Sequence, residues 1–268
     1  MLKLSACIEM LYNEMEFLKR PQAAADSEMD AIEFWGWNNK DLPALYEACQ
    51  KAKIPISACA VSTADKKKQE AWGRWGMLDR RNHGLLEEIV CETLEKVAPY
   101  GIKTLLITTG QALPLPRWMQ HDSIVDGLKR VAPVMEKAGA LLVLEPLNPM
   151  VNHRGYYLET SYEAFDIIRK VNSPKIKLLY DIYHQQITEG NLIENISFNA
   201  DLIGHIHVAD VPGRNQPGTG EICYERVFKA LDDSGYAGYT GLEYVAKNAT
   251  TAESLAETKA IRKMINSK

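Results

Sequence analysis

Short apolar runs recur along the whole chain, and each is bounded by Gly, Pro, Asn or Asp. They are rich in Leu, Ile and Val, and their apolar positions are nearly continuous, as expected of strands that are buried on both faces. The turn residues at their ends limit each run to the length of a strand. Eight strands are predicted, over residues 2–10, 30–36, 54–61, 103–110, 141–148, 176–183, 203–210 and 239–245.

The segments between these strands follow the helical period instead. In 83–100, for example, the apolar positions recur close to the 3.6-residue repeat of one helix face. Gly139 is a typical helix terminator, and Thr160 with Glu163 three residues later has the spacing of a capping box. Helices are predicted over 83–100, 123–139, 160–171, 223–235 and 251–265.

The alternation of strand and helix predicts an α/β fold with a parallel sheet closed into a (β/α)8 TIM barrel. An open doubly wound sheet is the alternative, but no glycine-rich dinucleotide fingerprint follows the first strand. The 268 residues fit one barrel and contain no linker or repeat, so 1–268 is predicted to be a single domain. The least regular stretch, 62–82, is expected to form a loop across the barrel mouth.

Composition narrows the class of partner. The chain is 46% hydrophobic and 25% charged, with a formal net charge of -4, which gives no reason to expect nucleic acid or an anionic membrane. No apolar run approaches the roughly 20 residues that span a bilayer, and the first residues lack a signal-peptide pattern. Five widely spaced cysteines without a C-x-x-C pair are typical of reduced thiols. We therefore expect a cytoplasmic protein with a small-molecule ligand.

Candidate chemistry lies at the ends of four consecutive predicted strands. In a TIM barrel the functional side chains lie at the carboxyl ends of the strands. Alternation along the fifth strand places Leu141, Val143 and Glu145 on one face. The last inward position of each late strand carries a side chain that can bind a metal: Glu145, Asp181, His207 and Glu243. We expect these four side chains to converge on one point.

Each residue alone has an ordinary alternative. A carboxylate at a strand end is usually a helix N-cap or is solvated, and a single strand histidine is more often a hydrogen-bonded core residue. Three carboxylates close together would repel one another in a low-dielectric mouth unless a cation neutralised them. One divalent metal ion is therefore predicted, and the mainly oxygen ligands favour Mn²⁺, Mg²⁺ or Co²⁺, with Zn²⁺ as a further option.

The reaction expected of such a centre is proton transfer on carbon. The chain contains neither a nucleophile elbow nor a Walker sequence. Chelation of a carbonyl and its neighbouring hydroxyl would acidify the intervening C–H and stabilise an enediolate. Glu145 and Glu243, one on each side of the substrate, could then remove the proton and return it elsewhere. The residues thus predict an isomerase or epimerase of an α-hydroxy carbonyl compound.

Four further residues are predicted to contact this substrate. His184 and Arg214 would project above the metal, where they could hold a substrate oxygen or a carboxylate. Glu33 and Trp35 would line the opposite wall of a sugar site. A surface salt bridge is the alternative for Arg214, and core packing is the alternative for Trp35. His205 shares a face with His207 one layer deeper and is expected to support it by hydrogen bonding.

Five motifs occur in order along the second half of the chain. They are LEPLN (144–148), GYYLET (155–160), LLYDIYHQQITEGNL (178–192), IGHIHVADVPGRNQPGTGEICY (203–224) and GYTGLEY (238–244). Together they resemble the hydroxypyruvate isomerase family of the xylose isomerase-like barrels. The resemblance implies a metal-dependent interconversion of hydroxypyruvate and tartronate semialdehyde. It also implies metal ligation by Glu145, Asp181, His207 and Glu243, with Glu145 and Glu243 as the acid/base pair.

Two departures leave the substrate open. Some members of that family have glutamine in place of His207, whereas ketose 3-epimerases of the tagatose or psicose type have histidine. Segment 66–82 also differs from the glycine-rich loop of hydroxypyruvate isomerases. A ketose 3-epimerase is therefore the alternative, and it would use the same enediolate.

Two other classes remain as alternatives on the same barrel. An endonuclease IV-like hydrolase would need more histidine ligands and a basic groove, and the chain has only six histidines and net charge -4. A sugar-binding barrel without activity is the other alternative. Assembly into a homo-oligomer is compatible with the sequence, which shows no interface patch.

Overall fold

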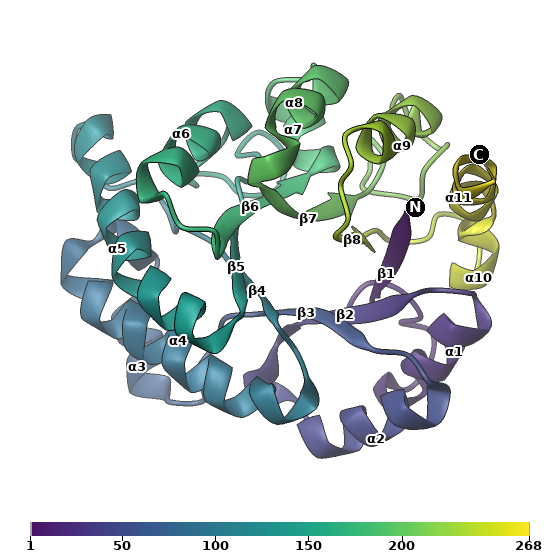
Figure 1. Cartoon of the computed structure of the whole chain (residues 1–268), viewed down its shortest axis with the longest axis horizontal. Helices are drawn as coiled ribbons and strands as arrows, with labels where there is room; N and C mark the ends of the chain where they lie inside the picture. The colour runs from purple at the N-terminus through teal and green to yellow at the C-terminus, as the bar shows by residue number, and fades with distance from the viewer. Residues whose placement is uncertain (1, 268) are drawn as a thin grey trace.

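Eight parallel strands close into a barrel in the order of the sequence, with β8 paired to β1. The computed structural model describes residues 2–267, and Figure 1 looks along the barrel axis. The predicted (β/α)8 architecture is confirmed, although every strand is shorter than its apolar run. The strands are β1 Lys3–Cys7, β2 Ala31–Gly36, β3 Ile56–Ala60, β4 Thr104–Ile107, β5 Leu141–Leu144, β6 Ile176–Asp181, β7 Ile203–Val208 and β8 Tyr239–Leu242.

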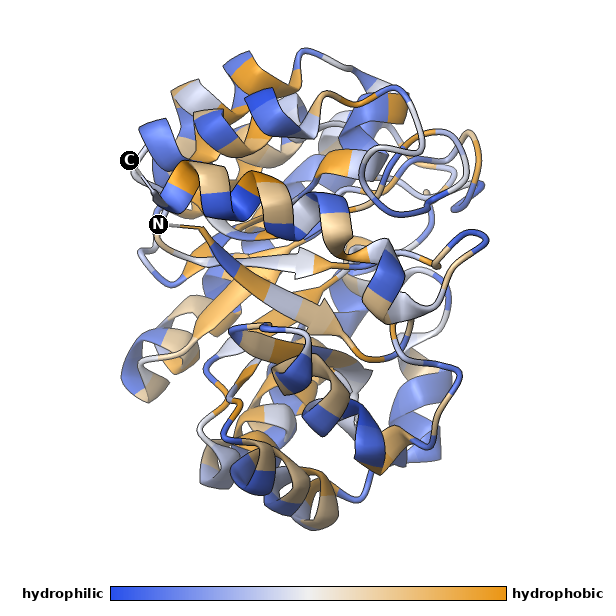
Figure 2. Cartoon of the chain, turned by 90° about the vertical axis from the view of Figure 1, so that its right-hand side faces the viewer, coloured by the Kyte–Doolittle hydropathy of each residue, from blue (hydrophilic) through white to orange (hydrophobic). Residues whose placement is uncertain are grey.

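Helices surround the barrel, and Figure 2 shows apolar and polar residues interspersed along them, whereas the strands are mostly apolar. Several short 3-10 turns lie between them. The helices are α1 Arg20–Asp26, α2 Leu42–Ala52, α3 Lys66–Trp72, α4 His83–Val97, α5 Arg117–Ala138, α6 Ser161–Val171, α7 Ile182–Thr188, α8 Leu192–Asn199, α9 Tyr224–Asp233, α10 Thr251–Ser254 and α11 Ala256–Asn266.

Three helical expectations need correction. Helix α5 begins at Arg117 rather than 123, with Pro116 at its N-cap; its first residues expose the apolar Trp118 and Met119 and bury the polar Gln120 and His121, which hides the helical period. The Thr160 side chain does accept a hydrogen bond from the Glu163 N–H, but the Glu163 carboxylate pairs with Arg117 instead of completing the box. The predicted helix over 251–265 is two helices, α10 and α11.

The barrel interior has an apolar half and a polar half. Strands β3 to β6 contribute an apolar cluster of their own, separate from the larger core between strands and helices; it consists of Ala58, Leu106, Val143 and Leu179. In the polar half, buried Glu33 of β2 lies against His205 of β7. A barrel interior is normally filled by branched apolar side chains, so a buried carboxylate and imidazole there call for a chemical explanation.

The segment between β3 and α4 is more ordered than the predicted loop. It contains α3 and two 3-10 turns, and it packs against the end of β4. The Met77 N–H donates to the Thr109 carbonyl at 3.1 Å, and a Cβ at Gly76 would lie only 2.3 Å from that oxygen. Gly76 also has a φ of +51°, so glycine allows this close approach on two grounds.

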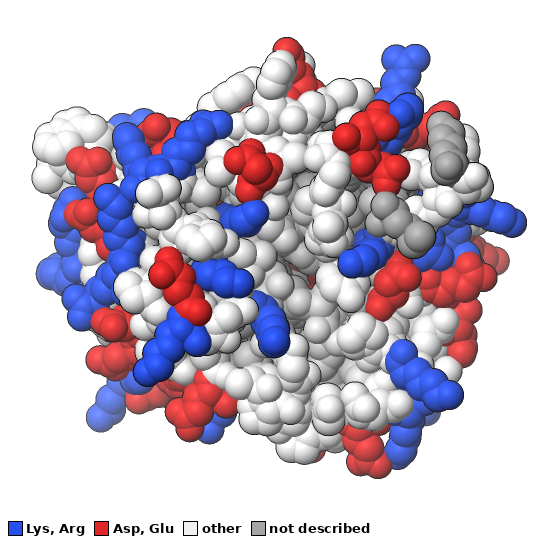
Figure 3. Space-filling model, in the orientation of Figure 1, with Lys and Arg blue, Asp and Glu red and all other residues white. Residues whose placement is uncertain are grey.

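The charges on the face seen in Figure 3 are of both signs, with basic and acidic side chains interspersed around its rim. This fits the small net charge of -4. Within residues 2–267, no helix has the length and apolar character needed to cross a membrane.

Candidate metal and catalytic site

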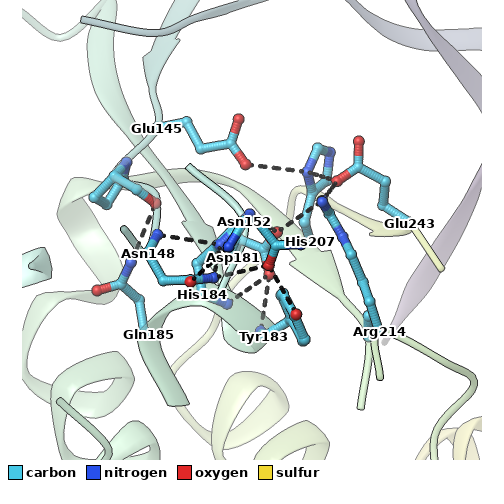
Figure 4. A network of polar contacts seen from close by, with 12 residues as sticks. Glu145, Asn148, Asn152, Asp181, Tyr183, His184, Gln185, His207, Arg214 and Glu243 are labelled. Atoms are coloured by element: carbon cyan, nitrogen blue, oxygen red, sulfur yellow. Dashed lines mark hydrogen bonds and ion pairs between the residues drawn. The ribbon is translucent and has the colours of Figure 1, made fainter. Parts of the chain in front are cut away.

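The four strand-end residues come together at the carboxyl end of the barrel. Asp181 ends β6, His207 lies in β7, and the two glutamates directly follow β5 and β8. Figure 4 shows the carboxylates arranged around the His207 ring. One potential ligand atom from each residue lies within 4.8 Å of all the others, and every one of these side chains is buried. The four residues are Glu145, Asp181, His207 and Glu243.

His207 lies at the centre of this cluster. Its Nδ1 is 3.6 Å from Glu145 Oε1 and 3.4 Å from Glu243 Oε2, and its Nε2 is 2.8 Å from Glu33 Oε1. Both ring nitrogens are buried, and the three contacts are ion pairs rather than well-aligned hydrogen bonds. Burial lowers the pKa of His207, but the negative charges of Glu243 and Glu33 outweigh it, so the pKa is raised well above its usual value.

Asp181 has two functions at once. Its Oδ1 accepts the backbone N–H groups of Tyr183 at 2.8 Å and His184 at 3.3 Å, and so caps α7. Its Oδ2 lies 3.5 Å from His184 Nε2 and 3.7 Å from Arg214 Nη2. Burial raises the pKa of Asp181, while the charges of Arg214 and His207 oppose this. The helix cap and the metal ligand are therefore compatible interpretations of the same carboxylate.

Glu243 is held by cationic and polar neighbours on several sides. Trp35 Nε1 donates to its Oε1 at 2.9 Å, and Arg214 Nη2 donates to its Oε2. Burial raises the pKa of Glu243, but His207 and Arg214 overcome that effect, so the pKa lies well below its usual value. Glu243 is therefore ionised at neutral pH.

A cavity of about 530 Å³ opens above the cluster. Of the residues predicted to contact substrate, Trp35 and Arg214 line it, together with His153. The far wall comes from β3, β4 and the segments beyond them and is mostly apolar: Ala60, Val61, Trp72, Leu86, Ile89, Leu106, Ile107 and Leu147. Such a wall would keep water away from a reacting carbon.

His184 and Glu33 lie outside the cavity lining. His184 is fully buried; its Nδ1 contacts the Asn148 side chain at 2.6 Å and its Nε2 faces Asp181. Burial lowers the pKa of His184 to about 3, so the ring is neutral. Glu33 lies beneath His207, on the side away from Glu145 and Glu243. Neither side chain contacts the cavity in this structure.

Sequence analysis did not identify Asp210, which supports the loop that carries Arg214. The buried Asp210 carboxylate accepts four backbone N–H groups within the loop that carries Arg214. They belong to Val211, Gly218, Gly220 and Ile222, at 2.9, 2.9, 2.9 and 3.2 Å. An aspartate directly before a glycine- and proline-rich loop is the signal that could have identified it.

The donor set suits a divalent cation. His207 Nδ1 is a buried nitrogen without a hydrogen-bond partner, and carboxylates face it from two sides. Three carboxylates and one imidazole would provide the oxygen-rich ligation preferred by Mn²⁺, Mg²⁺ or Co²⁺. The described residues therefore fit a metal ion at this point.

Comparison with known proteins gives consistent results. The sequence model of the xylose isomerase-like TIM barrels matches residues 21–264. The chain is 30% identical to hydroxypyruvate isomerase of Escherichia coli (strain K12) over 259 residues, which cover 94% of this chain and 96% of that protein. It is 28% identical to 2-oxo-tetronate isomerase of Pectobacterium atrosepticum, with 92% and 94% covered.

Among solved structures, one titled as an AP endonuclease of family 2 from Brucella melitensis superimposes with a TM-score of 0.88. It is 24% identical in sequence, and the match covers 97% of this chain and 99% of that one. At 24% sequence identity, this structural similarity shows a shared fold and nothing further about function.

Proposed function

Because this chain belongs to the xylose isomerase-like TIM barrel family, we propose that it is a metal-dependent isomerase of hydroxy-keto acids or ketoses. Within this class we propose hydroxypyruvate isomerase activity, the interconversion of hydroxypyruvate and tartronate semialdehyde. The observation that carries the proposal is the convergence of Glu145, Asp181, His207 and Glu243 within 4.8 Å at the barrel mouth.

The same four residues would hold one divalent ion, Mn²⁺, Mg²⁺ or Co²⁺ by the oxygen-rich donor set. When bound, such an ion polarises a substrate carbonyl and its neighbouring hydroxyl and so acidifies the C–H between them. The remaining chemistry belongs to side chains of this chain.

Glu243 and Glu145 are placed to move the proton. Their carboxylates approach His207 Nδ1 from different sides, and both line the cavity. Glu243 starts as a base, because His207 and Arg214 keep its pKa low in spite of its burial. Glu145, on the other side, would deliver a proton to the neighbouring carbon or to the opposite face. Removal of a proton by the Glu243 carboxylate and donation of a proton by the Glu145 carboxyl group in its acid form would give isomerisation or epimerisation through an enediolate.

Trp35 and Arg214 orient Glu243 and shape the place where the substrate lies. Trp35 Nε1 fixes one carboxylate oxygen and Arg214 fixes the other. The Arg214 guanidinium also borders the cavity, where it could bind a substrate carboxylate or hydroxyl pair. The apolar far wall would exclude the water that could otherwise protonate the enediolate at the wrong carbon.

A ketose 3-epimerase is the second candidate. His207 favours it, since ketose 3-epimerases of the tagatose or psicose type have histidine at this position. The cavity of about 530 Å³ also has more room than a three-carbon acid needs.

A hydrogen–deuterium exchange assay tests the proposal. The Mn²⁺-loaded protein is incubated in ²H₂O with hydroxypyruvate, 2-oxo-tetronate, tetruloses, fructose and psicose, and carbon-bound deuterium is followed by NMR. We expect exchange with at least one hydroxy-keto compound, and the compound that exchanges fastest identifies the substrate class. Exchange with none of them would contradict the proposal.

Metal analysis of the same protein separates the alternative classes. One Mn- or Co-type ion per chain supports the isomerase. Three zinc ions would indicate an endonuclease IV-like hydrolase, and a protein that takes up no metal would indicate a binding barrel without activity.

A further inference from the structure

Glu33 is a buried carboxylate that the proposed reaction does not use directly. It is 1% exposed and lies in the polar half of the barrel interior. One of its oxygens is 3.0 Å from His205 Nε2, and the other is 2.8 Å from His207 Nε2. Burial raises the pKa of Glu33, but the two histidines overcome this and lower it to about 2, so the group is ionised. A buried anion in such a place is retained at a considerable desolvation cost.

The barrel provides a specific space for this carboxylate. Gly241 of β8 pairs with His207 of β7, and a Cβ at Gly241 would lie 2.3 Å from Glu33 Oε1. On another side, Ser57 Oγ lies 3.3 Å from Glu33 Oε2 and is itself 2.7 Å from Ser5 Oγ. Gly241 has no positive φ that would require glycine, so the space for the carboxylate is the reason that the structure gives for a glycine there.

We propose that Glu33 is a positioning residue that fixes the orientation of the His207 ring, and that His205 in turn fixes Glu33. With Nε2 held by Glu33, the ring turns Nδ1 toward Glu145 and Glu243, where the metal ion of the proposed function would bind. Carboxylates that hold the outer nitrogen of a ligating histidine typically change metal affinity 10- to 100-fold. This inference rests on the proposed function, because it assigns Glu33 a role toward that metal.

The same three side chains have another interpretation that the test must separate. One potential ligand atom each from Glu33, His205 and His207 also lies within 4.8 Å of the others, so they could bind a second ion themselves. The contacts of 2.8 and 3.0 Å are those of directly paired side chains, and the residues are at most 2% exposed. We therefore favour orientation of His207, and the stoichiometry of bound metal decides.

The experiment compares metal binding by the full chain and by Glu33→Gln, which keeps the size of the side chain and removes its charge. Isothermal titration with Mn²⁺ should give one site in the wild type and a Kd about 10- to 100-fold higher in Glu33→Gln. Glu189→Gln is the matched control, because Glu189 is a half-buried glutamate bound to Ser161 and Asn195, away from the cluster. Its Kd should equal that of the wild type.

Orientation is distinguished from simple loss of charge by the visible absorption spectrum at saturating Co²⁺. A displaced His207 changes the ligand geometry, so the spectrum of Glu33→Gln should differ from the wild-type spectrum, while that of Glu189→Gln should not. Gly241→Ala keeps the charge but crowds the carboxylate, and should weaken Mn²⁺ binding and alter the spectrum in the same direction.

The outcomes separate the two proposals. A wild type that binds no metal contradicts the proposed function. A wild type that binds one ion, with an unchanged Kd or an unchanged Co²⁺ spectrum in Glu33→Gln, overturns the positioning role alone. Two ions in the wild type and one in Glu33→Gln would also overturn it, in favour of a second metal site. If Gly241→Ala does not fold, the spectrum of Glu33→Gln still decides.

Discussion

Single residues in this site combine a structural contact with a chemical one. Asp181 caps α7 with one oxygen and faces the cluster with the other, and Glu243 is held by Trp35 and Arg214 while its oxygen lies near His207. Rotamer freedom at these positions is therefore small. A catalytic carboxylate that is already oriented loses less entropy on reaching the transition state.

The acid/base pair gives the first prediction at this scale. Glu145→Gln and Glu243→Gln should each lower turnover by at least about 100-fold, because general acid–base catalysis typically contributes that much. The amide keeps the size of the side chain, so circular dichroism and the melting temperature should show an intact fold. Deuterium exchange and turnover are the measurements, and wild-type turnover in either variant would show that its acid/base role is wrong.

Arg214 gives a prediction about binding and pH together. Arg214→Ala removes a charged group from the cavity, so KM should rise roughly 10-fold or more, as expected for a hydrogen bond to a charged partner. It should also raise the pKa of Glu243, which Arg214 helps to keep low. Since a base works only when ionised, the acid limb of the kcat profile should move to higher pH. If KM is unchanged for every substrate and the acid limb of the kcat profile does not move, Arg214 does not bind substrate or tune Glu243, and its role is a structural salt bridge.

At the residue scale, the sequence identified the positions that lie at the last inward step of a strand. Glu145 and His207 could be found because alternation and strand ends are local patterns. The contacts of Glu33 and His184 could not, since they depend on residues distant in the sequence, His205 and His207 for Glu33 and Asn148 for His184. Gly241 leaves room for the Glu33 carboxylate because it has no side chain. Since Gly241 lies in a distant strand, the sequence around Glu33 does not reveal this relation.

At the scale of elements, the pattern found all eight strands, but it did not predict five of the eleven described helices: α1, α2, α3, α7 and α8. Short helices such as α7 and α8 lack the length over which a 3.6-residue period becomes visible. The start of α5 was missed because apolar residues are exposed and polar residues are buried there, the reverse of an ordinary amphipathic helix. The stretch 62–82 was expected to be irregular, yet tertiary contacts with the end of β4 give it α3 and two 3-10 turns.

The close contact between this segment and β4 can be tested with a pair of glycines. Gly76→Ala should destabilise the protein by more than Gly101→Ala, since both have positive φ but only Gly76 would place its Cβ against the Thr109 carbonyl. The left-handed conformation costs about 1–2 kcal/mol in both variants, and the clash should add about 1–3 kcal/mol in Gly76→Ala. Urea denaturation measures the free energy of unfolding of each. Equal decreases in the free energy of unfolding would mean that the segment accommodates the added methyl group at position 76 without a further energetic cost.

For the molecule as a whole, the cluster links metal binding to stability. Four buried carboxylates, Glu33 included, lie near two cationic groups, and a divalent ion would offset their mutual repulsion. At an Mn²⁺ concentration about 100-fold above Kd, the folded state should gain about 2.7 kcal/mol. That corresponds to a rise in melting temperature of roughly 5–10 °C for a chain of this size.

Differential scanning fluorimetry with Mn²⁺ or EDTA measures this shift. Glu189→Gln should retain the full rise, whereas Asp181→Asn, which removes one ligand charge, should lose most of it. A wild-type melting temperature that is the same with Mn²⁺ and with EDTA would contradict the predicted coupling.

The loop after β7 has a consequence for how this scaffold could acquire other specificities. Because the Asp210 carboxylate accepts four backbone N–H groups between Val211 and Ile222, it anchors the loop that carries Arg214, and we expect the loss of this carboxylate to displace Arg214. On the opposite rim, the side chains of Asp65, Asp79 and Asn82 each bind no more than two backbone groups in the contacts described for residues 61–82. We therefore expect directed evolution toward new substrates to accumulate substitutions in residues 61–82 and to leave Asp210 and the loop of residues 211–222 unchanged.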